Sequence, residues 1–233
     1  MNVDVVKEYN DNGCMFWVEQ LAGAFVRGKT AEEALDKLPA EVRAYTLWAN
    51  GRAEQVDAVN ISYEKKSVLK VEDADSDVLF PSERLPMNMA EYTLQKELAI
   101  RSAKDFRALY LSVPQRDRAL VKSRQTFYGK IPASAKEMVT HTNNTLAYYA
   151  AGIGIEHTNL EDFVDNRLEL FKEIEGNRDF LLVRVFTAKD GEEWTLKKLM
   201  RRLIWHDRIH AKALYRKAIT FWSKERIVNP FGV

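Results

Sequence analysis

The segment Thr195–Phe221 reads TLKKLMRRLIWHDRIHAKALYRKAITF, and its pattern is the strongest indication of the fold of the C-terminal half. Its apolar residues recur at helical spacing, which predicts a long amphipathic helix with Thr195 as its N-cap. His206 and His210 continue the apolar stripe one turn apart, so both imidazoles are expected on the buried face. The opposite face carries cations that we expect to remain in solvent, namely Lys197, Lys198, Arg201, Arg202 and Arg208.

Three segments before this helix show the same periodicity. They cover about residues 90–111, then 132–151 with Pro132 in the first turn, and then a stretch opened by a capping box at Thr158-Asn-Leu-Glu161 and ended near Gly176. A short β-like piece at 180–186 and a turn at Asp190-Gly191 lead into the last helix. Four helices in this order predict an all-α, up-down four-helix bundle over residues 88–233.

A third histidine, His141, lies on the inward stripe of the helix predicted at 132–151. Two imidazoles from one helix and one from another can surround a point about 2 Å from each nitrogen. The alternative is a set of core histidines satisfied by ordinary hydrogen bonds. Burying imidazoles without partners costs on the order of 1–3 kcal/mol each, so a shared partner is favoured. We therefore predict that His141, His206 and His210 hold a divalent metal.

The N-terminal part shows strand signals instead. Alternating patterns at 2–9, 14–20 and 23–27, with a turn at Asp11-Asn12-Gly13, predict three strands. A capping box, Thr30-Ala-Glu-Glu33, opens a helix that Pro39 kinks or divides. One or two short strands are expected within 56–62 and 67–71. The order β-β-β-α-β predicts an α+β domain over residues 1–75, followed by an acidic, proline-punctuated linker at 76–87.

The composition restricts the setting in which the protein works. The 35 Lys and Arg residues against 34 Asp and Glu residues provide no field to attract nucleic acid, which we do not expect as a partner. The N-terminus lacks the basic and apolar regions of a signal peptide, and no apolar run approaches the roughly 18 residues of a spanning helix. The single cysteine, Cys14, suits a reducing compartment. We expect a soluble, cytoplasmic protein without a membrane partner.

The pattern Glu193-Trp194-Thr195 through His206-Asp-Arg-Ile-His210 resembles the last helix of the DinB-like (YfiT-like) metal-binding bundle family. Glu137-Met-Val-Thr-His141 resembles that family's second helix, which donates the first ligand. The resemblance covers about residues 88–220 and implies a Ni, Zn or Mn site with three His ligands and open positions. It also implies a small-molecule substrate and an enzyme that transfers a low-molecular-weight thiol or performs a hydrolysis.

A second resemblance lies in the N-terminal part. The run Leu21-Ala-Gly23-Ala-Phe-Val-Arg-Gly28-Lys-Thr30-Ala-Glu-Glu33-Ala34 resembles the HicB antitoxin domain over about residues 1–75. It implies a partial, non-catalytic version of the ribonuclease H sheet. The alternative function follows from it: a non-catalytic interaction protein in which a HicB-like partner-binding module is fused to a scaffold bundle. Both resemblances favour a homodimer.

Several side chains near the predicted ligands are candidates for supporting roles. Glu137 and Asp207 either orient imidazoles or are solvated helix charges, and Thr145 and Tyr148 either line the pocket or pack in the core. The remaining candidates are two packing aromatics (Trp205 and Trp222), an exposed loop histidine (His157), a buried thiol (Cys14), and a basic loop that either stays solvated or binds an anionic cosubstrate (Arg116, Arg118, Lys122 and Arg124).

Overall fold

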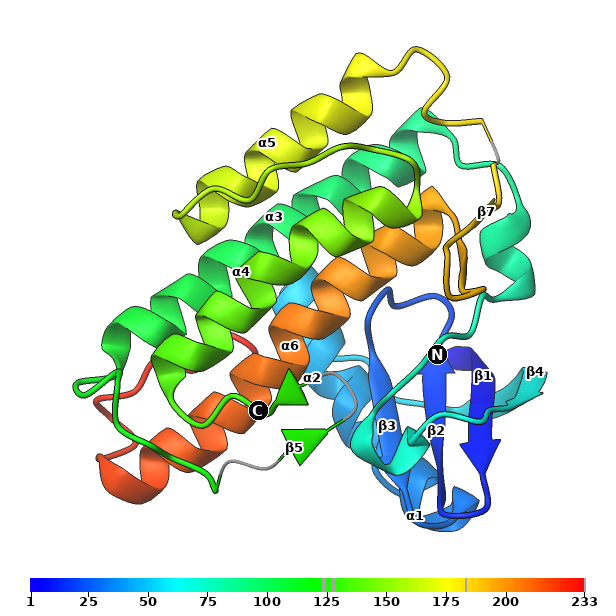
Figure 1. Cartoon of the computed structure of the whole chain (residues 1–233). Helices are drawn as coiled ribbons and strands as arrows, with labels where there is room; N and C mark the ends of the chain where they lie inside the picture. The colour runs from blue at the N-terminus through cyan, green and yellow to red at the C-terminus, as the bar shows by residue number, and fades with distance from the viewer. Residues whose placement is uncertain (123–124, 127–128, 183, 233) are drawn as a thin grey trace.

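The computed structural model describes residues 1–122, 125–126, 129–182 and 184–232. It shows an α+β chain, in which an N-terminal mixed sheet of four strands is followed by helices, as Figure 1 shows. The α+β class and the order of its two parts were predicted correctly from the hydrophobic patterns.

The sheet has the strand order β3-β2-β1-β4. Strands β1 (Asn2–Asn10), β2 (Gly13–Val18) and β3 (Phe25–Gly28) form an antiparallel meander, and β4 (Ala58–Lys66) pairs in parallel with β1. The first three strands and the later one confirm the predicted β-β-β-α-β order. The additional strand considered at 67–71 does not form, since the chain there enters the short 3-10 helix η1 (Val71–Asp73).

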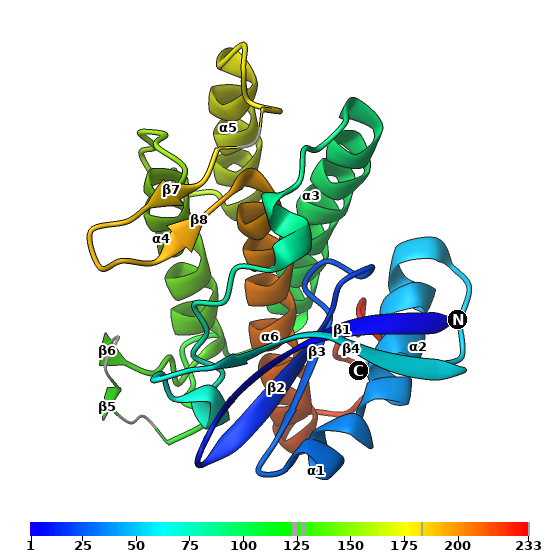
Figure 2. The same cartoon turned by 90° about the vertical axis from the view of Figure 1, so that its right-hand side faces the viewer.

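Two short helices connect β3 to β4. Helix α1 (Ala31–Leu35) begins as predicted, because the Thr30 hydroxyl accepts a hydrogen bond from the amide of Glu33. Pro39 divides the predicted helix in two and lies in the first turn of α2 (Leu38–Asn50), where the missing N–H is tolerated. Both helices pack against the sheet, as Figure 2 shows.

The C-terminal part is built on four long helices among the described residues. Their bounds are α3 (Met89–Ser112), α4 (Ala135–Gly152), α5 (Phe163–Gly176) and α6 (Leu196–Phe221). Helix α6 packs between α3 and α4, and α5 packs on the same two helices (Figure 1). Thr195 caps α6 as predicted, because its hydroxyl accepts a hydrogen bond from the amide of Lys198.

Two of the predicted helix starts were wrong. Helix α4 begins after Ser134, which forms a capping box with Glu137, so Pro132 lies outside the helix. Helix α5 begins after Asp162, whose carboxylate accepts from two free amides, so the box predicted at 158–161 is not used. Both corrections have one cause: a nearby side chain satisfies the first-turn amides better than the predicted cap.

Short strand pairs lie in the connections from α3 to α4 and from α5 to α6. Strand β7 (Phe186–Thr187) pairs with β8 (Glu193–Trp194), and β5 (Gln125–Thr126) pairs with β6 (Gly129–Lys130). The β-like piece predicted at 180–186 is therefore reduced, among its described residues, to Phe186.

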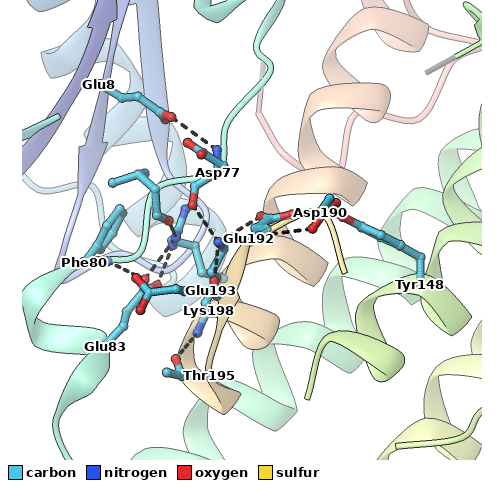
Figure 3. A network of polar contacts seen from close by, with 12 residues as sticks. Glu8, Asp77, Phe80, Glu83, Tyr148, Asp190, Glu192, Glu193, Thr195 and Lys198 are labelled. Atoms are coloured by element: carbon cyan, nitrogen blue, oxygen red, sulfur yellow. Dashed lines mark hydrogen bonds and ion pairs between the residues drawn. The ribbon is translucent and has the colours of Figure 1, made fainter. Parts of the chain in front are cut away.

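The cationic face of α6 is buried, which corrects the expectation that it remains in solvent. Lys198 donates to the carbonyl oxygens of Asp77 and Glu193 at 2.8 and 2.7 Å, a network drawn in Figure 3. Arg201 pairs with Glu83 at 2.6 Å, and Arg208 pairs with Glu41. Arg202 is also buried and Lys197 is half-buried. The N-terminal part, the segment after it and β8 supply the carboxylates, carbonyls and aromatic rings that make this burial possible.

The hydrophobic core extends through both parts of the chain. One cluster contains Phe16 and Val42 from the N-terminal part together with Phe106 and Leu203 from the long helices. Within the predicted linker, Val78, Leu79, Phe80 and Met87 are buried. The division into residues 1–75, 76–87 and 88–233 stays a prediction. Among the described residues, no helix has the length and apolar character needed to cross a membrane.

Candidate metal centre

The structure brings the three predicted histidines together. His206 and His210 lie one turn apart on α6, and His141 reaches them from α4. The Nε2 atom of His206 lies 3.3 Å from Nε2 of His141 and 3.1 Å from Nε2 of His210. One nitrogen from each ring lies within 4.8 Å of the others. The three side chains are positioned to bind a metal ion.

These distances fit the edges of a metal site. Two imidazole nitrogens each about 2.0–2.1 Å from one ion, at an angle of roughly 100°, are about 3.2 Å apart. The two separations from His206 Nε2, 3.1 and 3.3 Å, agree with that value. Without an ion, the N–H of His206 can serve only one of these two contacts at a time, because neutral imidazole carries a single N–H.

The charge state of the three rings also suits ligation, which requires the neutral form. Burial lowers the pKa of His141, and burial with the neighbouring His210 and His141 lowers the pKa of His206 well below its ordinary value. Burial and His141 lower the pKa of His210 to about 3. The rings are therefore neutral near pH 7 and keep a lone pair for a cation.

Two hydroxyl groups contact the outer nitrogen of His206. Thr145 Oγ1 lies 3.1 Å and Tyr149 OH 3.4 Å from Nδ1, and both residues come from α4. Thr145 was a predicted candidate, whereas Tyr149 was missed and Tyr148 was proposed in its place. Tyr148 is exposed, and its hydroxyl donates to Glu192 at 2.9 Å. Both residues belong to the polar network drawn in Figure 3. Stepping by four residues from His141 leads to Thr145 and then Tyr149, and this signal could have found the correct tyrosine.

The two acidic candidates have other partners. Asp207 is fully buried and forms a two-pronged ion pair with Arg167, at 3.1 and 3.2 Å, while Ser102 donates to the same carboxylate. It is therefore neither a solvated charge nor bonded to an imidazole. Glu137 is exposed and caps α4 by accepting from the amides of Ala133 and Ser134. Both interactions stabilise the fold.

The fourth histidine, His157, was expected in solvent, and this was wrong for its side chain, which is completely buried. Its Nδ1 lies 2.6 Å from Glu173 and its Nε2 lies 2.8 Å from Asn166. The ring anchors the loop before α5 to that helix. Cys14 is buried as expected, and burial raises the pKa of its thiol.

The remaining residues singled out in the sequence are two tryptophans and the basic loop. Trp205 is buried against Trp17, with ring centroids 5.7 Å apart, and Trp222 is half-buried against the core, so both are packing residues as predicted. In the basic loop, Arg116 lies over Tyr110 and Arg118 lies over Phe221. Lys122 is exposed. Arg124 lies outside the described residues.

Comparison of the chain with protein-family models, with curated proteins and with solved structures found no match. The DinB-like and HicB-like resemblances therefore stay predictions, and the geometry of the three histidines carries the functional argument.

Proposed function

We propose that this protein is a divalent-metal-dependent enzyme whose ion is held by His141, His206 and His210. The observation that carries the proposal is the convergence of three neutral imidazole nitrogens, from two helices, at separations of 3.1 and 3.3 Å. Three-nitrogen sites with an open position are typical of catalytic metals, whereas structural zinc sites are closed by four protein ligands. Imidazole ligands favour Zn or Ni, with Mn as the harder alternative.

The proposed reaction is transfer of a low-molecular-weight thiol to a small electrophilic substrate. Hydrolysis of the substrate is the alternative reaction. A divalent ion at such a site lowers the pKa of a thiol or of water and so supplies a nucleophile at neutral pH. In thiol transfer the sulfur forms the new bond to the electrophile, and the thiol proton leaves with the displaced group. The protein's own contribution is to keep the three rings neutral and oriented.

The architecture forms part of the same proposal. We take α3 to α6 as the up-down four-helix bundle of a DinB-like protein, and residues 1–75 as a HicB-like, partial ribonuclease-H-like unit. The four packed helices and the β-β-β-α-β order of the first part support this assignment. A homodimer is the proposed assembly, which light scattering on the purified chain would measure directly.

The test begins with the metal content of protein purified without a His tag. We expect about one equivalent of Zn, Ni or Mn per chain after loading, and its loss in His206→Ala, because each ligand contributes to the same ion. His157→Gln is the matched control, since this buried histidine lies outside the cluster. Equal metal in the wild type and in His206→Ala would rule the proposal out.

A second measurement separates catalysis from structural support. Visible spectra of the Co²⁺-loaded protein should change when a small thiol such as cysteine is added, because an open position accepts the sulfur. Two rate measurements then distinguish thiol transfer from hydrolysis. Thiol transfer is measured with the thiol and an aryl halide, and hydrolysis is measured with an aryl ester and no thiol. A chelator that lowers only the melting temperature, with no spectral response to any thiol or change in rate, would identify a stabilising metal instead.

A further inference from the structure

His206 has two different hydroxyl partners on Nδ1, the ring nitrogen that faces away from the other two histidines. These partners can influence which nitrogen of the ring carries the proton. Thr145 Oγ1 lies 3.1 Å and Tyr149 OH lies 3.4 Å from His206 Nδ1. A neutral imidazole places its single proton on one nitrogen, and the partner of the other nitrogen decides which. The inference drawn from this arrangement rests on the proposed metal site.

The hydroxyl proton of Thr145 has a backbone acceptor in its own helix. Its hydroxyl donates to the backbone carbonyl of Thr142 at 2.8 Å, one turn earlier in α4. Toward His206 the Thr145 oxygen can therefore only accept, which requires a proton on Nδ1. With the proton there, the lone pair of His206 is on Nε2 and faces His141 and His210. Thr145 thus favours the tautomer that can ligate a metal.

Tyr149 can favour the opposite tautomer. Its hydroxyl carries a proton that can be donated to Nδ1 of His206. The phenol is neutral, since burial raises its pKa. When Tyr149 donates, the imidazole proton lies on Nε2, where it can be donated to the Nε2 of His210 or His141, at 3.1 and 3.3 Å. In the absence of an ion, this arrangement gives His206 Nε2 a hydrogen bond to one of its two close neighbours.

We propose that His206 changes tautomer when the metal binds, and that Thr145 and Tyr149 are positioning residues that stabilise the metal-bound and the metal-free tautomer respectively. The proton lost from Nε2 is balanced by one gained at Nδ1, so His206 itself releases no net proton. Tyr149 therefore opposes metal binding, and the balance between the two hydroxyls sets the affinity of the site.

The first experiment reads the tautomer directly. Nitrogen-15 correlation spectra of histidine side chains distinguish a protonated from an unprotonated Nδ1 in each ring. In the metal-free protein we expect His206 to carry its proton on Nε2, and after addition of Zn²⁺ on Nδ1. A metal-free protein with the proton already on Nδ1 would overturn the proposal, whatever the affinity for zinc.

The second experiment measures the Zn²⁺ dissociation constants of three variants. Thr145→Val should weaken binding about tenfold or more, as loss of an outer hydrogen bond to a metal ligand does elsewhere, and Thr145→Ser should restore it. Tyr149→Phe should tighten binding by roughly two- to tenfold, because one competing hydrogen bond is removed. A structural role would weaken binding in both cases, so the opposite signs are diagnostic.

Matched controls are available on the same helix. Thr142→Val removes a hydroxyl that donates to the Met138 carbonyl, and Tyr148→Phe removes one that contacts Glu192, and neither touches His206. Both should leave the zinc affinity unchanged. If Tyr149→Phe weakens binding as Thr145→Val does, the tautomer proposal is wrong while the metal site stands. If the wild type binds no metal, the proposed function fails, and the metal-free spectrum still tests the tautomer.

Discussion

The indole of Trp205 lies nearly parallel to the imidazole of His206, with ring centroids 5.6 Å apart and an interplanar angle of 19°. The same indole packs against Trp17 at 5.7 Å and Phe25 at 6.1 Å. Trp205 therefore contacts the sheet with one part of its surface and the candidate metal ligand with another. A change at the metal centre should be visible in the emission of this residue.

Binding of Co²⁺ or Ni²⁺ should quench part of the tryptophan fluorescence, because an open-shell ion near His206 lies close to the Trp205 indole. The Trp205→Phe variant should lose most of the quenching while retaining metal. A fluorescence titration with each ion, compared with elemental analysis, checks both statements.

Trp222→Phe provides the control for this titration. Trp222 follows the C-terminus of α6, twelve residues after His210, a separation of about 18 Å at the helical rise per residue. Its removal should leave the amplitude of quenching nearly intact. Quenching that depends equally on Trp222 and Trp205 would place the bound ion somewhere other than the three histidines.

Replacing Glu41 should destabilise the protein strongly. Its carboxylate is buried and pairs with Arg208 at 3.0 Å and with Lys212. In Glu41→Gln the Arg208 guanidinium stays buried without a counterion, which we expect to cost about 3 kcal/mol of unfolding free energy. Urea denaturation measures the change. Asp11→Asn removes an exposed ion pair with Lys66 and should cost less than about 0.5 kcal/mol.

Gly23 should not tolerate a side chain. Its φ is +84°, and a Cβ atom there would lie 2.6 Å from the backbone nitrogen of Trp205. Gly23→Ala combines an unfavourable left-handed conformation with a clash against the backbone of α6, together about 3 kcal/mol. In Gly176→Ala the new methyl group meets open space, so this control should be neutral or slightly stabilising. Thermal denaturation of the two variants provides the comparison.

The buried carboxyl of Glu8 should make stability depend on pH. Burial raises its pKa above the ordinary value of 4.5, although the hydrogen bond from the Asp77 amide and the charge of Arg201 oppose this effect. Above pH 4.5 the unfolded carboxyl loses its proton while the folded one keeps it, so the unfolded state binds fewer protons. Stability attributable to Glu8 is therefore lost as pH rises from 4.5 through the folded pKa.

The Glu8→Gln variant isolates this contribution. Its unfolding free energy, relative to the wild type, should increase between pH 4 and pH 7, because glutamine cannot ionise. Glu64→Gln serves as control, since Glu64 is exposed and pairs with Lys7 on the same sheet. A flat difference for Glu8→Gln in urea denaturation across this range would show that the pKa of Glu8 is not raised in the folded state.

The sequence was sufficient for the parts of the fold that depend on local periodicity. Helix α6 and its Thr195 cap, the strands of the meander, and the inward stripe that holds His206 and His210 follow from spacing alone. The meeting of His141 with this pair was predicted because three of only four histidines lay on inward stripes. The structure confirms their proximity, whereas the bound metal stays a prediction.

What could not be predicted depends on contacts between distant segments. The cations Lys198, Arg201 and Arg208 look like a solvated face in the sequence, because their partners Asp77, Glu83 and Glu41 lie more than a hundred residues away along the chain. Asp207 was misjudged for the same reason, since nothing near it in the sequence indicates Arg167. Tyr149 and Tyr148 point to different sides of α4, and a helical-wheel projection would have identified Tyr149 as the residue on the side of His141.

Because Trp205 packs against both the sheet and His206, substitutions in the sheet can affect the metal centre. Substitutions in β2 or β3 that disturb Trp17 or Phe25 will displace the indole that flanks His206. We expect these variants to remain folded but to bind the metal ion more weakly, although the substituted residues lie far from the histidines in the sequence. A screen scored only on solubility would therefore overlook them.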